Sequence, residues 1–274
     1  MDEYRDMNRA LWNEWVDINA GSAFYGLDEF RKGGTKLRPY ELEEVGPVDG
    51  KSLLHLQCHF GMDTLSWARE GARVTGADFS ERGIEVARQL TGDLGLEATF
   101  VHSDIYELPD RLEGEFDVVY TSRGVLNWLP DLTRWAQVVT HFVKPGGILY
   151  ITEIHPVVQV FDDEVQQPVL RLRYPYWTTE KPLEFENVGS YADLSAPVTV
   201  PFEYDWTHSL GEIVTAVAQA GLRIEFLHEF DFIEWRVPPL VERVGDVWRM
   251  PRGRFGDPEG ELPLFFSLRA SKPN

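Results

Sequence analysis

The middle of the chain alternates between two hydrophobic patterns. Short apolar runs predict buried strands over residues 53–56, 73–77, 98–102, 116–121 and 148–153. Between them, apolar residues recur three and four positions apart and predict helices over residues 62–70, 81–94 and 132–143. Strands that alternate with helices in this way predict a parallel sheet covered by helices on both faces.

The pattern changes in the flanking and inserted segments. Residues 1–50, with helical spacing at 8–18, predict an N-terminal helical cap. Residues 155–204 show no regular strand or helix periodicity and hold many prolines and aromatic residues, which indicates an inserted antiparallel lid. A capping box from Ser209 to Glu212 begins a helix that ends near residue 220. A strand over 222–232, an irregular stretch over 233–261 and a terminal strand over 262–270 follow, so the sheet domain is expected over 51–154 and 205–274.

The charge and cysteine content of the chain limit which kinds of partner it can bind. The 274 residues carry a formal net charge of −19, and so acidic a surface repels phosphate backbones, which disfavours nucleic acid as a partner. The longest apolar runs are too short to cross a bilayer, and the first six residues lack the apolar core of a signal peptide. We therefore expect a cytoplasmic protein that does not insert into a membrane. The single cysteine, Cys58, excludes an internal disulfide and a cysteine-based zinc cage, and we expect no metal site.

The segment after the first predicted strand is the most informative. A tight loop leads through Gly61 into a helix, and the next strand ends on an acid, Asp78. Helix-terminal N–H groups and a carboxylate then meet at the carboxyl ends of neighbouring parallel strands. Such a place suits a nucleoside cofactor, because the acid can accept hydrogen bonds from both ribose hydroxyls.

These residues resemble the class I S-adenosylmethionine-dependent methyltransferases. The resemblance rests on the loop His55-Leu-Gln-Cys-His-Phe-Gly61, on Asp78, on Asp104 and on Lys144-Pro-Gly-Gly147, and it spans roughly residues 50–155, 204–232 and 262–270. In that family the first strand and loop carry an acid and three glycines, whereas here His55, Gln57 and His59 stand at three of those positions. The loop form resembles a bacterial branch that acts on small molecules. The resemblance implies a Rossmann-like three-layer α/β sandwich with a mostly parallel seven-stranded sheet, an antiparallel last strand and an antiparallel lid insertion.

The departures from the glycine pattern favour one cofactor. A dinucleotide pyrophosphate requires close backbone approach, which Gln57 and His59 would crowd. S-adenosylmethionine has no phosphate, and its amino and carboxylate groups can be met by side-chain amides, imidazoles and loop N–H groups. The alternative is that His55 and His59 only pack.

The resemblance assigns a role to each residue at the strand ends. Asp78 would hold the ribose hydroxyls, Phe79 would lie against the adenine, and Asp104 with Ile105 would meet the adenine edge. The cofactor-binding set is Gln57, His59, Gly61, Asp78, Phe79, Asp104, Ile105 and Thr121, the last beside the methionine portion. Asp78 as a strand-end cap and Asp104 as a helix N-cap are the structural alternatives.

Methyl transfer from a sulfonium imposes no obligatory catalytic motif, since the protein mainly aligns the reactants, excludes water and sometimes removes a proton. His155 and His208 are the candidate bases, because imidazole titrates near neutral pH; histidines that only bond to backbone are the alternative. The candidate substrate contacts are Arg123, Trp128, Glu153 and Tyr204. The aromatic residues of the lid suggest a small aromatic or hydrophobic methyl acceptor.

Two other functions stay open at this point. An NAD-dependent oxidoreductase of Rossmann type would share the strand order but is disfavoured by the missing glycines. A non-catalytic ligand-binding protein on the same fold has no sequence feature against it.

Overall fold

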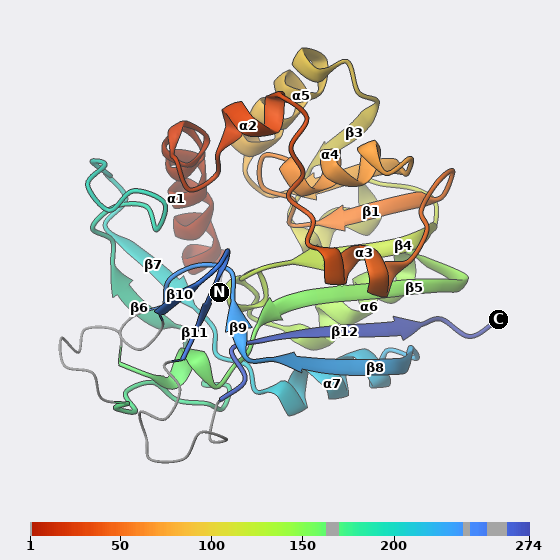
Figure 1. The fold of residues 1–274 in the computed structure, drawn as a ribbon. Coiled ribbons are helices and arrows are strands. Elements are labelled where there is room, and N and C mark those ends of the chain that lie inside the picture. The colour runs from red at the N-terminus through yellow and green to blue at the C-terminus, as the bar shows by residue number, and fades with distance from the viewer. Residues whose placement is uncertain (1, 163–169, 238–241, 251–261) are drawn as a thin grey trace.

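The chain folds around a seven-stranded sheet. A computed structural model describes residues 2–162, 170–237, 242–250 and 262–274 (Figure 1). The strands lie in the order β3-β2-β1-β4-β5-β12-β8; β12 is antiparallel to both neighbours and the other pairs are parallel. Their bounds are β1 (Ser52–Leu56), β2 (Arg73–Asp78), β3 (Ala98–His102), β4 (Phe116–Ser122), β5 (Val143–Ile154), β8 (Arg223–Phe230) and β12 (Phe265–Ser271). The predicted fold class, with its antiparallel last strand, is confirmed.

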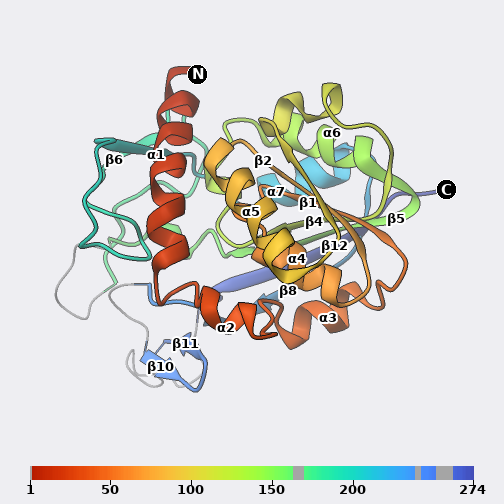
Figure 2. The ribbon, with the colours of Figure 1, turned by 90° about the horizontal axis from the view of Figure 1, so that it is seen from above.

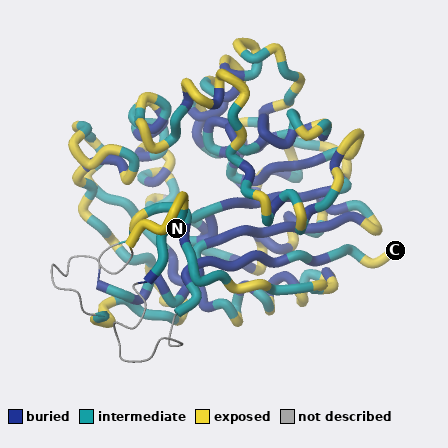
Figure 3. The backbone as a smooth tube through the Cα atoms, viewed as in Figure 1, coloured by how far each residue is buried: buried dark blue, intermediate teal, exposed yellow. Residues whose placement is uncertain are grey.

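Helices cover both faces because side chains along a strand point alternately to its two sides. On β1, Leu54 and Leu56 pack with the layer of η1, α6 and α7, whereas Leu53 packs with the layer of α3 and α4. Each layer places a fully buried tryptophan in the core, Trp135 from α6 and Trp67 from α4. Figure 3 shows the central strands as the most continuously buried part of the chain. The bounds are α3 (Pro39–Val45), α4 (Met62–Arg69), α5 (Glu81–Leu94), η1 (Ile105–Asp110), η2 (Leu126–Trp128), α6 (Leu132–Phe142), η3 (Val158–Val160) and α7 (Leu210–Gln219).

Two further segments lie together beside the sheet. Helix α1 (Asp2–Gly21) lies next to α5 on one side and next to an antiparallel hairpin on the other (Figures 1 and 2). The hairpin consists of β6 (Leu183–Glu186) and β7 (Phe202–Asp205), and the short α2 (Leu27–Arg31) follows α1. Antiparallel structure thus occurs in the inserted segment, as the sequence predicted; residues 163–169 of that segment lie outside the described ranges.

The sequence patterns missed a second small sheet. β9 (Phe232–Ile233), β10 (Glu242–Val244) and β11 (Val247–Arg249) pair antiparallel within the stretch expected to be irregular. These strands have only two or three residues each. A period of two cannot be recognised over so short a run.

The boundary between α6 and β5 also differs from expectation. Lys144 to Gly147 lie between the predicted helix over 132–143 and the predicted strand over 148–153, but β5 already begins at Val143. The pairing of β4 with β5 shifts register between Phe116 and Val118. Pro145 supplies no N–H to the ladder, and Gly146 has a φ of 74°. The motif is therefore an irregular strand start. Within the described ranges, no helix has the length and apolar character that crossing a membrane requires.

Candidate active site

The loop from β1 to α4 has an unusual backbone. Gln57, His59 and Gly61 have φ angles of 56°, 51° and 82°. Residues other than glycine rarely adopt this left-handed region, and those that do gather at functional sites. Glycine is needed at 61 for a second reason, since a Cβ there would lie 2.7 Å from the ring of Phe100. The loop can therefore turn sharply from the end of β1 into α4.

Asp78 ends β2 and braces this loop. One carboxylate oxygen accepts a hydrogen bond from His59 N at 2.8 Å, and the other accepts one from Ser80 N at 2.8 Å. Burial raises the pKa of Asp78 to about 6, although its backbone hydrogen bonds act in the opposite direction. A carboxylate has about four lone-pair sites. Asp78 thus acts as a strand-end brace and keeps the capacity to accept ligand hydroxyls.

Phe79 and Asp104 lie together beyond the ends of β2 and β3. With Arg5 of α1 they line a cavity of about 120 Å³. Asp104 caps η1 by accepting from Tyr106 N at 2.8 Å, and it pairs with Arg5 at 3.2 Å. Ile105 is buried. The cavity is smaller than the roughly 300–1,000 Å³ of small-molecule sites.

An aromatic cage lies to one side of His59, whose own ring contacts are with Trp12, Tyr25 and Phe60. Its members come from α1, from the segment after α1, from η2 and from the loop of the β6–β7 hairpin, and they are Trp12, Trp15, Tyr25, Trp128 and Tyr191. The Trp12 ring lies 5.0 Å from His59 and 5.3 Å from Trp128, measured between centroids. Tyr191 lies 5.4 Å from Trp15. Aromatic faces attract cations, so the cage suits a sulfonium.

Several buried polar atoms near the cage lack a hydrogen-bond partner among the described residues. They belong to α1, to the β1–α4 loop, to η2 and to the end of β7, and they are Trp12 Nε1, Trp15 Nε1, Gln57 Oε1, His59 Nδ1, Asn127 Oδ1 and Asp205 Oδ1. Native proteins leave few buried polar atoms unpaired, so a group of them calls for a ligand or ordered water. Burial also lowers the pKa of His59 to about 3, so its ring is neutral.

The cage and its polar atoms include residues that the sequence did not single out. The available signal was a pair of tryptophans, Trp12 and Trp15, in the segment with helical spacing at residues 8–18. Tyr191 lies in the aromatic-rich lid and is itself 45% exposed, and nothing local separates it from Trp177, which is 68% exposed.

Three predicted residues have different surroundings. Thr121 is fully buried at the end of β4, and its hydroxyl donates to Leu56 O at 3.4 Å. Trp128 belongs to the cage. Tyr204 instead faces α1. Its backbone carbonyl accepts a hydrogen bond from the Asn8 amide and its N–H donates to the Asn8 side-chain oxygen, while its hydroxyl donates to Glu184 at 3.1 Å.

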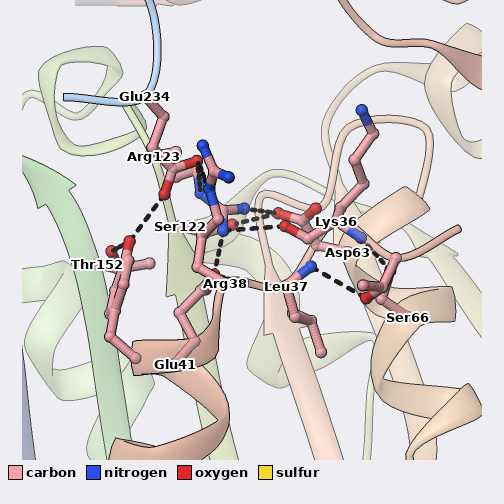
Figure 4. Close-up of polar contacts among 12 residues, drawn as sticks. Lys36, Leu37, Arg38, Glu41, Asp63, Ser66, Ser122, Arg123, Thr152 and Glu234 are labelled. Carbon is pink, nitrogen blue, oxygen red and sulfur yellow. Dashed lines mark hydrogen bonds and ion pairs between the residues drawn. The ribbon is translucent and has the colours of Figure 1, made fainter. Parts of the chain in front are cut away.

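Arg123 lies in a buried ion-pair cluster (Figure 4). Its guanidinium pairs with Glu41, with Asp63 at 2.7 Å and with Glu234 at 3.1 Å. The Arg123 side chain is 12% exposed, and its backbone φ is 59°. Burial raises the pKa of Glu41 to about 7, and Arg123 limits that rise. The guanidinium that was expected to contact substrate is thus occupied by three carboxylates.

Glu153 clamps the chain that follows β4. Its carboxylate accepts hydrogen bonds from the backbone N–H groups of Gly124, Val125, Leu126 and Ile154, at 2.5 to 3.1 Å. The side chain is buried, and burial raises its pKa. These contacts hold η2 against the sheet and leave the carboxylate engaged with backbone.

The two candidate histidines are held by fixed partners. His155 Nδ1 accepts from Val157 N at 3.1 Å, so Nε2 carries the proton and donates to Glu229 at 2.9 Å. His208 Nε2 donates to Leu129 O at 2.7 Å, and its Nδ1 faces the Thr178 hydroxyl at 3.4 Å. Burial lowers the pKa of both rings. These contacts match the structural alternative for each. Across the described part of the chain, no group of three or more potential metal ligands occurs.

Comparison with known proteins agrees with this geometry. Residues 53–147 match the protein-family model described as a methyltransferase domain. A structure of an S-adenosylmethionine-dependent methyltransferase from Mesorhizobium loti superposes with a TM-score of 0.57 at 20% identity, covering 85% of this chain and 95% of that one. The fold is that of the class I methyltransferases. A complex of the glycopeptide N-methyltransferase MtfA with S-adenosylmethionine gives a TM-score of 0.54 at 16% identity and covers 85% of this chain and 92% of its own.

A sequence relative adds a second comparison. The ubiquinone biosynthesis O-methyltransferase of Escherichia coli is 31% identical over 147 residues, which are 53% of this chain and 58% of the relative. The chain therefore spans little more than half the length of that curated relative. The residues that match the family model, 53–147, contain the β1–α4 loop and Asp78, and the cap and the hairpin lie outside them.

Proposed function

We propose that this protein is an S-adenosylmethionine-dependent methyltransferase that acts on a small aromatic or hydrophobic acceptor, at an O, N or C atom. The observation that carries the proposal is the pair of unpaired buried polar atoms on the β1–α4 loop, Gln57 Oε1 and His59 Nδ1, in the loop whose backbone Asp78 holds and whose His59 ring packs on Trp12. A neutral cage with hydrogen-bonding atoms fits a sulfonium amino acid better than it fits a pyrophosphate.

The residues present fit this cofactor. Asp78 would hold the ribose hydroxyls, and Phe79 with Asp104 would meet the adenine. Gln57 Oε1 and His59 Nδ1 are unpaired in the described structure and would meet the amino and carboxylate groups. When bound, the cofactor supplies an activated methyl group. The protein's own part is to position the acceptor, to exclude water by closing α1 and the hairpin over the loop, and to receive any proton released.

Titration calorimetry with S-adenosylmethionine and S-adenosylhomocysteine tests the proposal. We expect micromolar affinity for both and at least about a tenfold loss in Asp78→Ala, the scale of one or two charge-assisted hydrogen bonds. Glu97→Ala is the matched control, because Glu97 is exposed at the opposite end of β3. A folded wild-type protein that gives no heat with either compound, or that binds NADH instead, would refute the assignment.

A further inference from the structure

Asp205 lies where the hairpin meets the edge of the sheet domain. It is the last residue of β7, and the next residue, Trp206, donates its N–H to Asn127 O at 2.7 Å. Asn127 belongs to η2, directly after β4. Two residues earlier, Val125 O accepts from the Gln57 amide at 3.0 Å. Asp205 is thus joined through η2 to the cofactor loop.

Two oxygen atoms at this junction are buried without a partner in the part of the chain that the structure describes, Asp205 Oδ1 and Asn127 Oδ1. Both are hydrogen-bond acceptors. A buried acceptor is costly unless a donor meets it. The group that complements the pair must therefore carry O–H or N–H.

Asp205 also has a free acceptor atom, which His155 lacks. His155 and His208 each donate one ring N–H to a fixed partner, and the second nitrogen of His155 already accepts a backbone N–H. Burial raises the pKa of Asp205 above its ordinary value, partly offset by a hydrogen bond from the Asn127 side chain. A carboxylate with a raised pKa is a stronger base and can accept a proton from a ligand.

We propose that Asp205 binds the nucleophilic hydroxyl or amine of the methyl acceptor and receives its proton, with Asn127 as the second anchor. This inference rests on the proposed methyltransferase function. The oxygen or nitrogen lone pair of the acceptor forms the new bond to the methyl carbon, and the carbon–sulfur bond breaks with its electron pair returning to sulfur. The sulfonium becomes a neutral thioether, and the acceptor proton passes to the Asp205 carboxylate.

The contact between α1 and the residue after Asp205 indicates how a bound acceptor would be shielded from water. Trp206 follows Asp205 and lies 6.4 Å from Tyr4 of α1, between ring centroids. An acceptor that seats on Asp205 therefore lies at the meeting point of cap and hairpin, where both can shield it from water.

Fragment binding and methyl transfer test the proposal with the full chain. The probes are catechol for a hydroxyl, benzylamine for an amine and anisole as a donor-free ring, each added to protein saturated with S-adenosylhomocysteine and followed by saturation-transfer NMR. Transfer is measured with tritiated S-adenosylmethionine over pH 5.5 to 8.5. We expect catechol or benzylamine to bind and anisole not to bind, which also tells hydroxyl from amine.

The variants separate this role from the cofactor site. We expect Asp205→Asn to lower transfer at least tenfold and to abolish its rise with pH, while affinity for S-adenosylhomocysteine changes less than twofold. Glu184→Gln, an exposed carboxylate on the same hairpin, should behave as wild type. Asn127→Ala should raise KM and keep the pH profile, and it serves as the readout if Asp205→Asn does not fold.

Three outcomes would each overturn the proposal. They are full transfer by Asp205→Asn, equal binding of anisole, and no probe binding while S-adenosylhomocysteine binds. Failure of S-adenosylhomocysteine itself to bind would instead count against the methyltransferase assignment.

Discussion

The β1–α4 loop shows how single residues prepare the candidate site. Gln57, His59 and Gly61 all take left-handed backbone, yet only one of them is glycine. The His59 N–H is held by Asp78, so a side chain at a strand tip stabilises the neighbouring loop. The loop and the acid are thus coupled. A substitution of Asp78 should change the conformation of the loop, and a change in the loop should alter the hydrogen bonding of Asp78.

Gly61 gives the first prediction at this scale. Gly61→Ala should lower the free energy of unfolding by roughly 2–4 kcal/mol, because a Cβ there meets Phe100 and the backbone is left-handed. Gly92→Ala is the control, since nothing lies within 4 Å of a Cβ at this exposed helical position, and it should stabilise slightly. Urea unfolding measures both. Equal stabilities of the two variants would contradict the packing argument.

Asp78 gives a prediction about pH. Its pKa is about 6 in the folded ligand-free protein, against 3.8 for the ordinary group, so between these values the folded state holds a proton that the unfolded state has lost. The stabilisation is fully present below about pH 4 and is lost as pH rises through 6, by roughly 2–3 kcal/mol. Asp78→Asn should remove this part of the pH dependence. Unfolding by urea at pH 5 and pH 7.5 checks it, and an identical slope in the variant would contradict the shifted pKa.

At the scale of elements, α1 replaces a missing strand partner for the hairpin. The Asn8 side chain donates to Tyr204 O at 2.7 Å and accepts from Tyr204 N at 3.0 Å, as an adjacent strand would. Glu14 accepts from the N–H groups of Thr199 and Val200. One helix thus holds the hairpin by its backbone, and Trp12 and Asn19, on the same face of the helix as Asn8, contact His59 of the β1–α4 loop.

This arrangement predicts that the cap and the hairpin open together. Asn8→Ala leaves the buried backbone groups of Tyr204 without their partner, a loss of about 1–3 kcal/mol. We expect faster hydrogen exchange at residues 199–204 and weaker binding of S-adenosylhomocysteine, with exchange in β1 and β4 unchanged. Asp6→Ala, on the same helix with its side chain 62% exposed, is the control. Unchanged exchange at the hairpin would show that α1 does not hold it.

At the scale of the whole molecule, the Arg123 cluster joins segments far apart in sequence. Glu41 comes from α3, Asp63 from α4 and Glu234 from the segment after β9, and all three pair with the residue that follows β4. The cluster therefore connects the cap region, helix α4 after the β1–α4 loop, and the C-terminal part of the chain. Its role in substrate binding stays a prediction.

Removing the cation should destabilise the whole fold. Arg123→Gln leaves three buried or half-buried carboxylates facing one another, and breaking a buried pair costs about 3–5 kcal/mol. Urea unfolding should show one cooperative transition at lower concentration. Arg111→Gln, which removes an exposed pair with Glu107, should cost less than about 1 kcal/mol. A loss of similar size in both variants would contradict the buried cluster.

The local pattern of the chain determined the sheet, the β1–α4 loop and the acids at the strand tips. Strand and helix periods are properties of neighbouring residues, and the carboxyl ends of adjacent parallel strands must meet, so Gly61, Asp78 and Asp104 could be placed without coordinates. Tertiary structure alone decided what lies opposite them. The cage joins Trp12 to Tyr191, Arg123 is paired with Glu41 and Glu234, and His155 is fixed by Glu229. Such pairs depend on how a helix and a hairpin dock across the sheet, and no periodicity within either segment encodes that docking.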